Sequence, residues 1–116
     1  MYNFEKLKAW QEAMKLAKMS YVLSQKLPKE EKFALIDQLK RAVTSVSLNI
    51  AEGSGVGSSK VFASFIEISI RSLYETISIF KLIESLFGVD CKDELLQCDL
   101  VSKILHGLLK SVRSSN

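Results

Sequence analysis

Apolar residues recur every three or four positions along almost the whole chain, which is the spacing of one face of an α-helix. Pro28, Gly53 and Gly88 interrupt this pattern. The interruptions predict helices over residues 3–27, residues 30–53, residues 58–87, and from Asp90 or Asp93 onward. No segment shows the strict alternation of a half-buried strand. We therefore expect an all-α fold, a single up-down-up-down antiparallel four-helix bundle formed by residues 1–116.

The apolar stripes also predict which side chains fill the bundle. On the first helix the stripe is Phe4, Leu7, Trp10, Met14, Ala17 and Tyr21, and on the second it is Leu35, Leu39, Ala42, Val43, Val46 and Ile50. On the third helix it includes Phe62, Phe65, Ile66, Leu73, Phe80 and Ile83. From these stripes we expect the core to contain Trp10, Leu39, Val46, Phe65 and Leu73.

The third helix carries a second row beside its core stripe, which a bundle helix does not need. The row consists of Ile68, Ser72, Glu75, Ile79, Leu82 and Leu86, at steps of four and three residues. Such a row either packs on a neighbouring helix of the same chain or forms a contact between subunits. In a monomer of this size it would leave a large exposed apolar patch, so the pattern favours a subunit interface.

The second helix carries a polar row that ends at the glycine-rich loop. Its members are Gln38, Arg41, Ser45, Asn49 and Glu52. Polar side chains placed beside a core indicate hydrogen bonding. Three interpretations stay open at this point: a solvated boundary face, a polar contact between subunits, and a groove for a ligand.

The composition is that of an ordinary globular protein, with 47% hydrophobic and 25% charged residues among 116. The net charge of +3 arises entirely in residues 1–27, where five lysines face two glutamates. Nucleic acid is therefore a permitted partner, with Lys8, Lys15 and Lys18 as its candidate contacts. We expect a cytoplasmic protein, because no signal peptide or membrane span is visible and the two cysteines fit free thiols.

Enzyme chemistry has little support in the residues. His106 is the only histidine, so the Glu-x-x-His pairs of di-iron bundles are absent, and no cysteine and histidine cluster suggests zinc. The glycine-rich loop at residues 53–59 follows a predicted helix and lacks a phosphate-loop lysine, which favours a flexible connection. We expect no catalytic residues, no metal and no cofactor.

Residues 38–53, which read QLKRAVTSVSLNIAEG, resemble the signature of the bacterial 23S ribosomal RNA intervening-sequence proteins, also called four-helix-bundle proteins. The flanks agree: Phe4, Leu7, Trp10 and Ala13 at the start, Pro28 with Glu31, and the pattern from Phe62 to Glu75. The resemblance covers about residues 4–87. Two positions depart from the family pattern, Val56 in place of a basic residue and Arg71 in place of a small one. Glu67 and Glu75, each four residues from Arg71, are available to pair with it.

The resemblance implies a bundle that assembles into a homopentameric ring, and the family has no established catalytic role. Related bundle proteins serve as accessory subunits of diversity-generating retroelements and bind nucleic acid and a reverse transcriptase. We therefore expect a non-enzymatic, ring-forming interaction protein whose partners are itself and, through its basic surface, RNA or DNA. The alternative is a small-molecule-binding or catalytic bundle that uses the polar row of the second helix.

Overall fold

Four long α-helices account for most of residues 1–115, the part of the chain that the computed structural model describes. These residues contain no strand, which confirms the all-α prediction. The helices are α1 (Lys8–Ser24), α2 (Leu35–Ser54), α3 (Ser59–Phe87) and α4 (Lys92–Ser114), with 3-10 turns η1 (Asn3–Lys6) and η2 (Lys29–Glu31).

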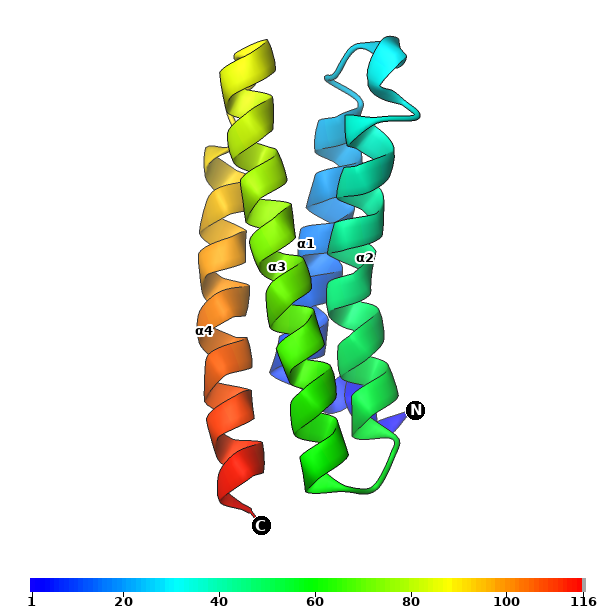
Figure 1. Cartoon of the computed structure of the whole chain (residues 1–116), viewed down its shortest axis with the longest axis vertical. Coiled ribbons are helices and arrows are strands. Elements are labelled where there is room, and N and C mark those ends of the chain that lie inside the picture. Colours follow the sequence, from blue (N-terminus) through cyan, green and yellow to red (C-terminus); the bar gives the residue numbers. More distant parts are fainter. Residues whose placement is uncertain (116) are drawn as a thin grey trace.

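The helices lie side by side along one long axis, and Figure 1 shows that the chain reverses direction after each of the first three. Each consecutive pair packs together, and α1 also packs against α4, which closes the arrangement. The 29 residues of α3 span about 44 Å at 1.5 Å per residue. This length nearly equals the longest extent of the molecule, 47 Å, so α3 runs from one end to the other.

The ends of α3 follow the sequence signals closely. The Ser58 hydroxyl accepts a hydrogen bond from the Val61 backbone N–H at 3.4 Å, as an N-cap does. Gly88 ends the helix in the left-handed region at φ 66°, where glycine has no steric cost.

The first two helices differ from expectation. The predicted helix 3–27 divides into η1 and α1 at extended Leu7, and α2 begins only at Leu35, after η2.

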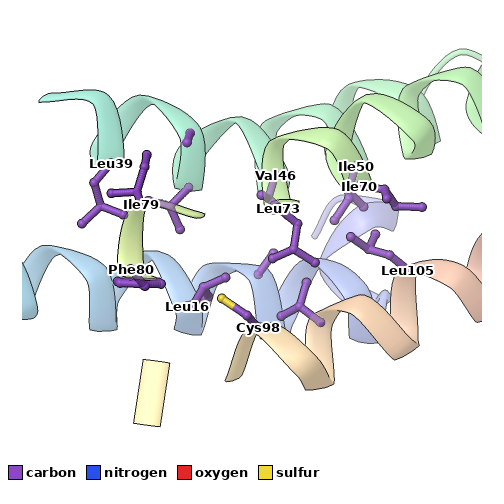
Figure 2. Packing of buried hydrophobic residues seen from close by; sticks show 14 of the residues in the cluster. Leu16, Leu39, Val46, Ile50, Ile70, Leu73, Ile79, Phe80, Cys98 and Leu105 are labelled. Carbon is purple, nitrogen blue, oxygen red and sulfur yellow. The ribbon is translucent and has the colours of Figure 1, made fainter. Parts of the chain in front are cut away.

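The core of α2 and α3 follows alternating steps of three and four residues, the spacing of helices that coil around each other. The buried row of α2 is Ile36, Leu39, Val43, Val46, Ile50 and Gly53, and that of α3 is Ile66, Ser69, Leu73, Thr76, Phe80 and Ile83. The predicted core residues Leu39, Val46 and Leu73 are fully buried. Figure 2 shows several of these side chains meeting Leu16 of α1 and Leu105 of α4.

The predicted core stripe of α1 is wrong by about one helical position. Trp10 and the other members of that stripe are half-buried or exposed, and Tyr21 is 43% exposed. The side chains that enter the core are instead Ala9, Ala13, Leu16, Ser20, Leu23 and Leu27. This face combines the small Ala9, Ala13 and Ser20 with three leucines, while Trp10 lies on the flank and packs edge-on against Phe4 at 5.2 Å. Phe65 of α3 is likewise half-buried rather than a core residue.

Polar side chains inside the bundle are hydrogen-bonded to backbone carbonyls. The Ser69 hydroxyl of α3 donates to the Val46 carbonyl of α2 at 2.9 Å, and the Ser20 hydroxyl donates to the Leu16 carbonyl at 2.8 Å. Among residues 1–115, no buried side-chain nitrogen or oxygen lacks a partner. The polar residues of the core therefore do not carry the desolvation cost of an unpaired group.

Gly53 marks a close approach of α2 to α3. A Cβ atom built on Gly53 would lie 2.5 Å from the Cβ of Phe65 and 3.0 Å from Cδ1 of Phe62. Such distances are shorter than packed atoms tolerate, so the last turn of α2 requires glycine to reach α3.

Gly53→Ala is expected to destabilise the protein by about 1 to 3 kcal/mol, because the two helices must separate to admit the methyl group. The matched control is Gly107→Ala in α4, where an added Cβ meets no atom within 4 Å. This control is expected to stabilise the protein by about 0.5 to 1 kcal/mol through helix propensity. Urea unfolding of both variants measures the difference, and the same sign for both would contradict the close approach.

Candidate interaction surfaces

The polar row of α2 and the second row of α3 face each other along one seam between the two helices. The hydroxyl oxygens of Ser45 and Ser72 are hydrogen-bonded at 2.8 Å. The Asn49 amide donates to the Ser45 backbone carbonyl at 2.8 Å and to its hydroxyl at 3.0 Å. These three side chains are therefore occupied within the chain, which favours a packing role for them over a ligand groove.

The other end of the seam is more open. The Gln38 amide donates to the Glu75 carboxylate at 3.4 Å, and Arg41 pairs with Asp37 on its own helix at 3.0 Å. Glu52, the last member of the polar row, is exposed near the opposite end of α2, away from Gln38 and Arg41. A shallow groove of about 530 Å³ opens at the Gln38 end, and its lining includes Gln38 and Arg41 together with Phe33, Leu35 and Leu86.

The second row of α3 is not uniformly exposed, and one member was assigned wrongly. Ile79 is only 2% exposed and belongs to the core of a single chain. Ile68 and Ser72 are half-buried, and Glu75, Leu82 and Leu86 are exposed. Ser72, Ile79 and Leu86 are spaced by seven residues and take the helix position beside the core, whereas Ile68, Glu75 and Leu82 lie one step further out. Helix position alone therefore does not account for the exposure of Leu86.

Two exposed apolar side chains on the α2 side were missed in the sequence. Phe33, just before α2, is 88% exposed, and Leu48 on the outer face of α2 is 64% exposed. Neither belongs to a periodic apolar stripe. An apolar residue outside such a stripe is the sequence signal that could have identified them. These two side chains, with Leu82 at 44% and Leu86 at 63% exposed, are here called the α2–α3 surface, and Phe33 and Leu86 among them line one groove.

Lys8, Lys15 and Lys18 lie on the side of α1 away from the core, as the helical spacing predicts, and all three are exposed. Lys8 forms an ion pair with Glu12, because its ammonium lies 3.2 Å from the Glu12 carboxylate. Hydrogen bonds from Gln97 of α4 and from Lys8 lower the pKa of Glu12. Lys15 and Lys18 are therefore the two less compensated charges of this surface, here called the lysine surface.

The two cysteines are free thiols inside the bundle. Burial raises the pKa of the Cys91 thiol to about 11, with nearby Glu84 adding to the effect. Burial likewise raises the pKa of the Cys98 thiol to about 12. Both groups are protonated at neutral pH and so are weak nucleophiles.

Within residues 1–115, no group of three or more histidine, cysteine, aspartate or glutamate side chains is arranged to hold a metal ion. His106 is exposed on α4, and its Nδ1 atom lies 2.8 Å from the Ser102 carbonyl oxygen. None of the described helices is both long and apolar enough to cross a membrane.

Residues 5–107 match the profile of the 23S rRNA-intervening sequence protein family. This chain belongs to that family. The matched region extends beyond the segment that carried the resemblance in the sequence and includes most of α4. No curated protein shows significant sequence similarity to the chain.

Residues 38–53, the segment that resembles the family signature, lie entirely within α2. The structure gives three of its positions a packing role at the seam: Ser45 bonds to Ser72, Asn49 bonds to Ser45, and Gly53 allows contact with Phe65. In this chain, much of the signature therefore specifies how α2 fits against α3.

Proposed function

We propose that this protein is a non-enzymatic interaction protein: an up-down-up-down antiparallel four-helix bundle that assembles with copies of itself into a closed ring, a homopentamer as the family resemblance implies. The observation that supports assembly is the α2–α3 surface. Phe33, Leu82 and Leu86 leave much of their apolar area in water, and burying the exposed part of each would contribute a share of the roughly 1.5 to 3 kcal/mol that full burial of such a side chain gives.

A repeated contact between two different patches of the same chain either closes into a ring or grows into a filament. The groove beside Leu86 offers one such patch, since Phe33 and Leu35 line it together with the charged Asp37 and Arg41. Charged residues at its edge would set the register of a partner copy, while the apolar side chains would supply the burial.

The molar mass in solution tests this assembly directly. Light scattering at micromolar concentration is expected to give a multiple of the chain mass of 13.0 kDa, about fivefold for a pentamer. Leu86→Asp is expected to lower that mass, whereas Ser85→Asp places the same charge on the adjacent exposed residue and leaves it unchanged. A wild-type mass of 13.0 kDa would contradict self-assembly.

The second part of the proposal is that the ring binds RNA or DNA through the lysine surface. Lys15 and Lys18 are exposed on one side of α1, and a ring would repeat them around the assembly, so weak phosphate contacts would add by avidity.

The role proposed here needs no catalytic residue, metal or cofactor. The free thiols suit a reducing compartment, and we place the protein in the cytoplasm.

Replacing Lys8, Lys15 and Lys18 with glutamine is expected to weaken binding to a single-stranded oligonucleotide and to flatten its salt dependence. Removing one lysine–phosphate interaction reduces the slope of log affinity against log salt by about 0.7. The control replaces Lys81, Lys92 and Lys103, which are also exposed but lie on α3 and α4. Equal affinity of the α1 variant and wild type at low salt would exclude the lysine surface as the binding site.

A further inference from the structure

A second groove, of about 470 Å³, lies between α3 and α4 on a surface that neither the assembly nor the lysine proposal uses. Arg71 of α3 and His106 and Arg113 of α4 contribute nitrogen donors to its lining. Ile68, Ile70 and Leu109 contribute apolar side chains. The Glu67 carboxylate and the Ser64 hydroxyl also line it. The groove thus combines two guanidinium groups, an imidazole and one carboxylate with an apolar wall.

The acidic residues available to neutralise Arg71 are engaged elsewhere. Glu67, four residues before it, accepts a hydrogen bond from Arg113 at 2.9 Å across the two helices. Glu75, four residues after it, accepts from Gln38 of α2. None of the ion pairs within residues 1–115 involves Arg71. Glu67 and Glu75, which the spacing makes available to Arg71, therefore form no ion pair with it, although Glu67 lines the same groove.

Arg113 and His106 each make one hydrogen-bond contact with a neighbouring residue and keep further nitrogen atoms outside it. Arg113 has five N–H donors, and its bond to Glu67 uses one of them. The Ser102 carbonyl can only accept, so the His106 Nδ1 atom carries the hydrogen of that 2.8 Å contact. This contact orients the ring and leaves Nε2 as the ring nitrogen that it does not use.

We propose that the groove between α3 and α4 binds a phosphate group. A planar guanidinium offers two parallel N–H donors that match phosphate oxygens, and two such groups together suit a tetrahedral anion. The groove is much larger than one phosphate, and its apolar wall gives room for an organic group attached to it, as in a nucleotide. The site is separate from the lysine surface and does not depend on it.

The test uses three ligands, each compared with chloride at equal ionic strength: inorganic phosphate, a nucleoside 5′-monophosphate and a single-stranded oligonucleotide. His106 is the only histidine, so its ring C–H signals in proton NMR report on the groove without ambiguity. A saturable shift of these signals is expected. Binding of the first two ligands identifies a free-phosphate or nucleotide site, and binding of the oligonucleotide alone identifies a polynucleotide site.

The double variant Arg71→Gln and Arg113→Gln is expected to weaken the affinity about tenfold or more, because it removes both charge-assisted contacts. The control, Lys81→Gln with Lys103→Gln, alters exposed lysines of the same two helices outside the groove and should bind as wild type. The variant with glutamine at positions 8, 15 and 18 should keep the His106 shift with inorganic phosphate, which separates this site from the lysine surface. No saturable shift with any ligand, or an unchanged affinity in the arginine variant, would overturn the proposal.

Discussion

An Ile79→Asp variant is expected to lose most of its stability rather than merely lose a partner chain. Ile79 is 2% exposed, and Figure 2 shows it in the same layer of the core as Leu39 and Phe80. A carboxylate at this position would be buried without a counter-ion, at a cost on the order of 3 to 5 kcal/mol. That is a large fraction of the roughly 5 to 15 kcal/mol that stabilises a typical domain. Circular dichroism during urea unfolding measures the loss.

The matched control is Leu86→Asp, which makes the same type of change on the same row, seven residues further along α3. Leu86 is 63% exposed, because it lies level with the segment preceding α2 and borders the open groove with Phe33 and Leu35. Leu86→Asp should keep its helical signal and change the stability of the isolated chain by less than about 0.5 kcal/mol. If both variants unfolded at the same urea concentration, Ile79 would not occupy the buried position described here.

The two variants also show why the second row of α3 could be found in the sequence but not interpreted from it. The spacing of Ile68, Ile79 and Leu86 establishes that they share one side of a helix. Their burial depends on where α2 begins and how closely it approaches, which is decided by residues far away in the chain. The fully covered Ile79 and the open Leu86 therefore look equivalent in sequence although their environments differ.

The helices themselves could be predicted because their signals are local. Ser58 caps α3 and Gly88 ends it, and both positions follow from short-range backbone chemistry. The start of α2 could not be predicted in the same way. Glu30 and Glu31 favour the first turn of a helix, but here they form a separate 3-10 turn before α2 begins at Leu35.

The core face of α1 was misassigned for a different physical reason. Hydrophobic patterns give weight to large side chains, so Trp10 and Tyr21 defined the expected stripe. In the folded chain small residues such as Ala9 and Ala13 face the centre, and Tyr21 lies at the surface, where the Lys40 ammonium sits 4.7 Å from its ring centroid. A close contact between helices is made by small residues, which carry little signal in such a pattern.

The candidate surfaces show the same division between local and distant information. The exposure of Lys15 and Lys18 follows from helical spacing alone. The bond between Ser45 and Ser72 and the pairing of Glu67 with Arg113 join different helices. Such cross-helix pairs require the relative rotation of the helices, which single-helix periodicity does not contain.

Leu39→Ala is expected to cost on the order of 2 to 5 kcal/mol of unfolding free energy. Leu39 is 0% exposed and packs within the central cluster, so the shorter side chain loses its buried area and leaves a cavity that the surrounding helices only partly close. The change introduces no charge and alanine favours the helix, so the effect isolates packing at this position.

Leu48→Ala is the matched control for Leu39→Ala, since it makes the same substitution on α2 at a side chain that is 64% exposed. Its effect on the isolated chain should be within about 0.5 kcal/mol. Self-assembly would make the apparent stability depend on concentration, so both variants are compared with wild type in urea at several protein concentrations. A loss of unfolding free energy in Leu39→Ala that persists at low protein concentration reflects packing in the core of one chain. Equal losses at Leu39 and Leu48 on dilution would contradict the packing face of α2 described here, because only one of the two side chains lies inside the bundle.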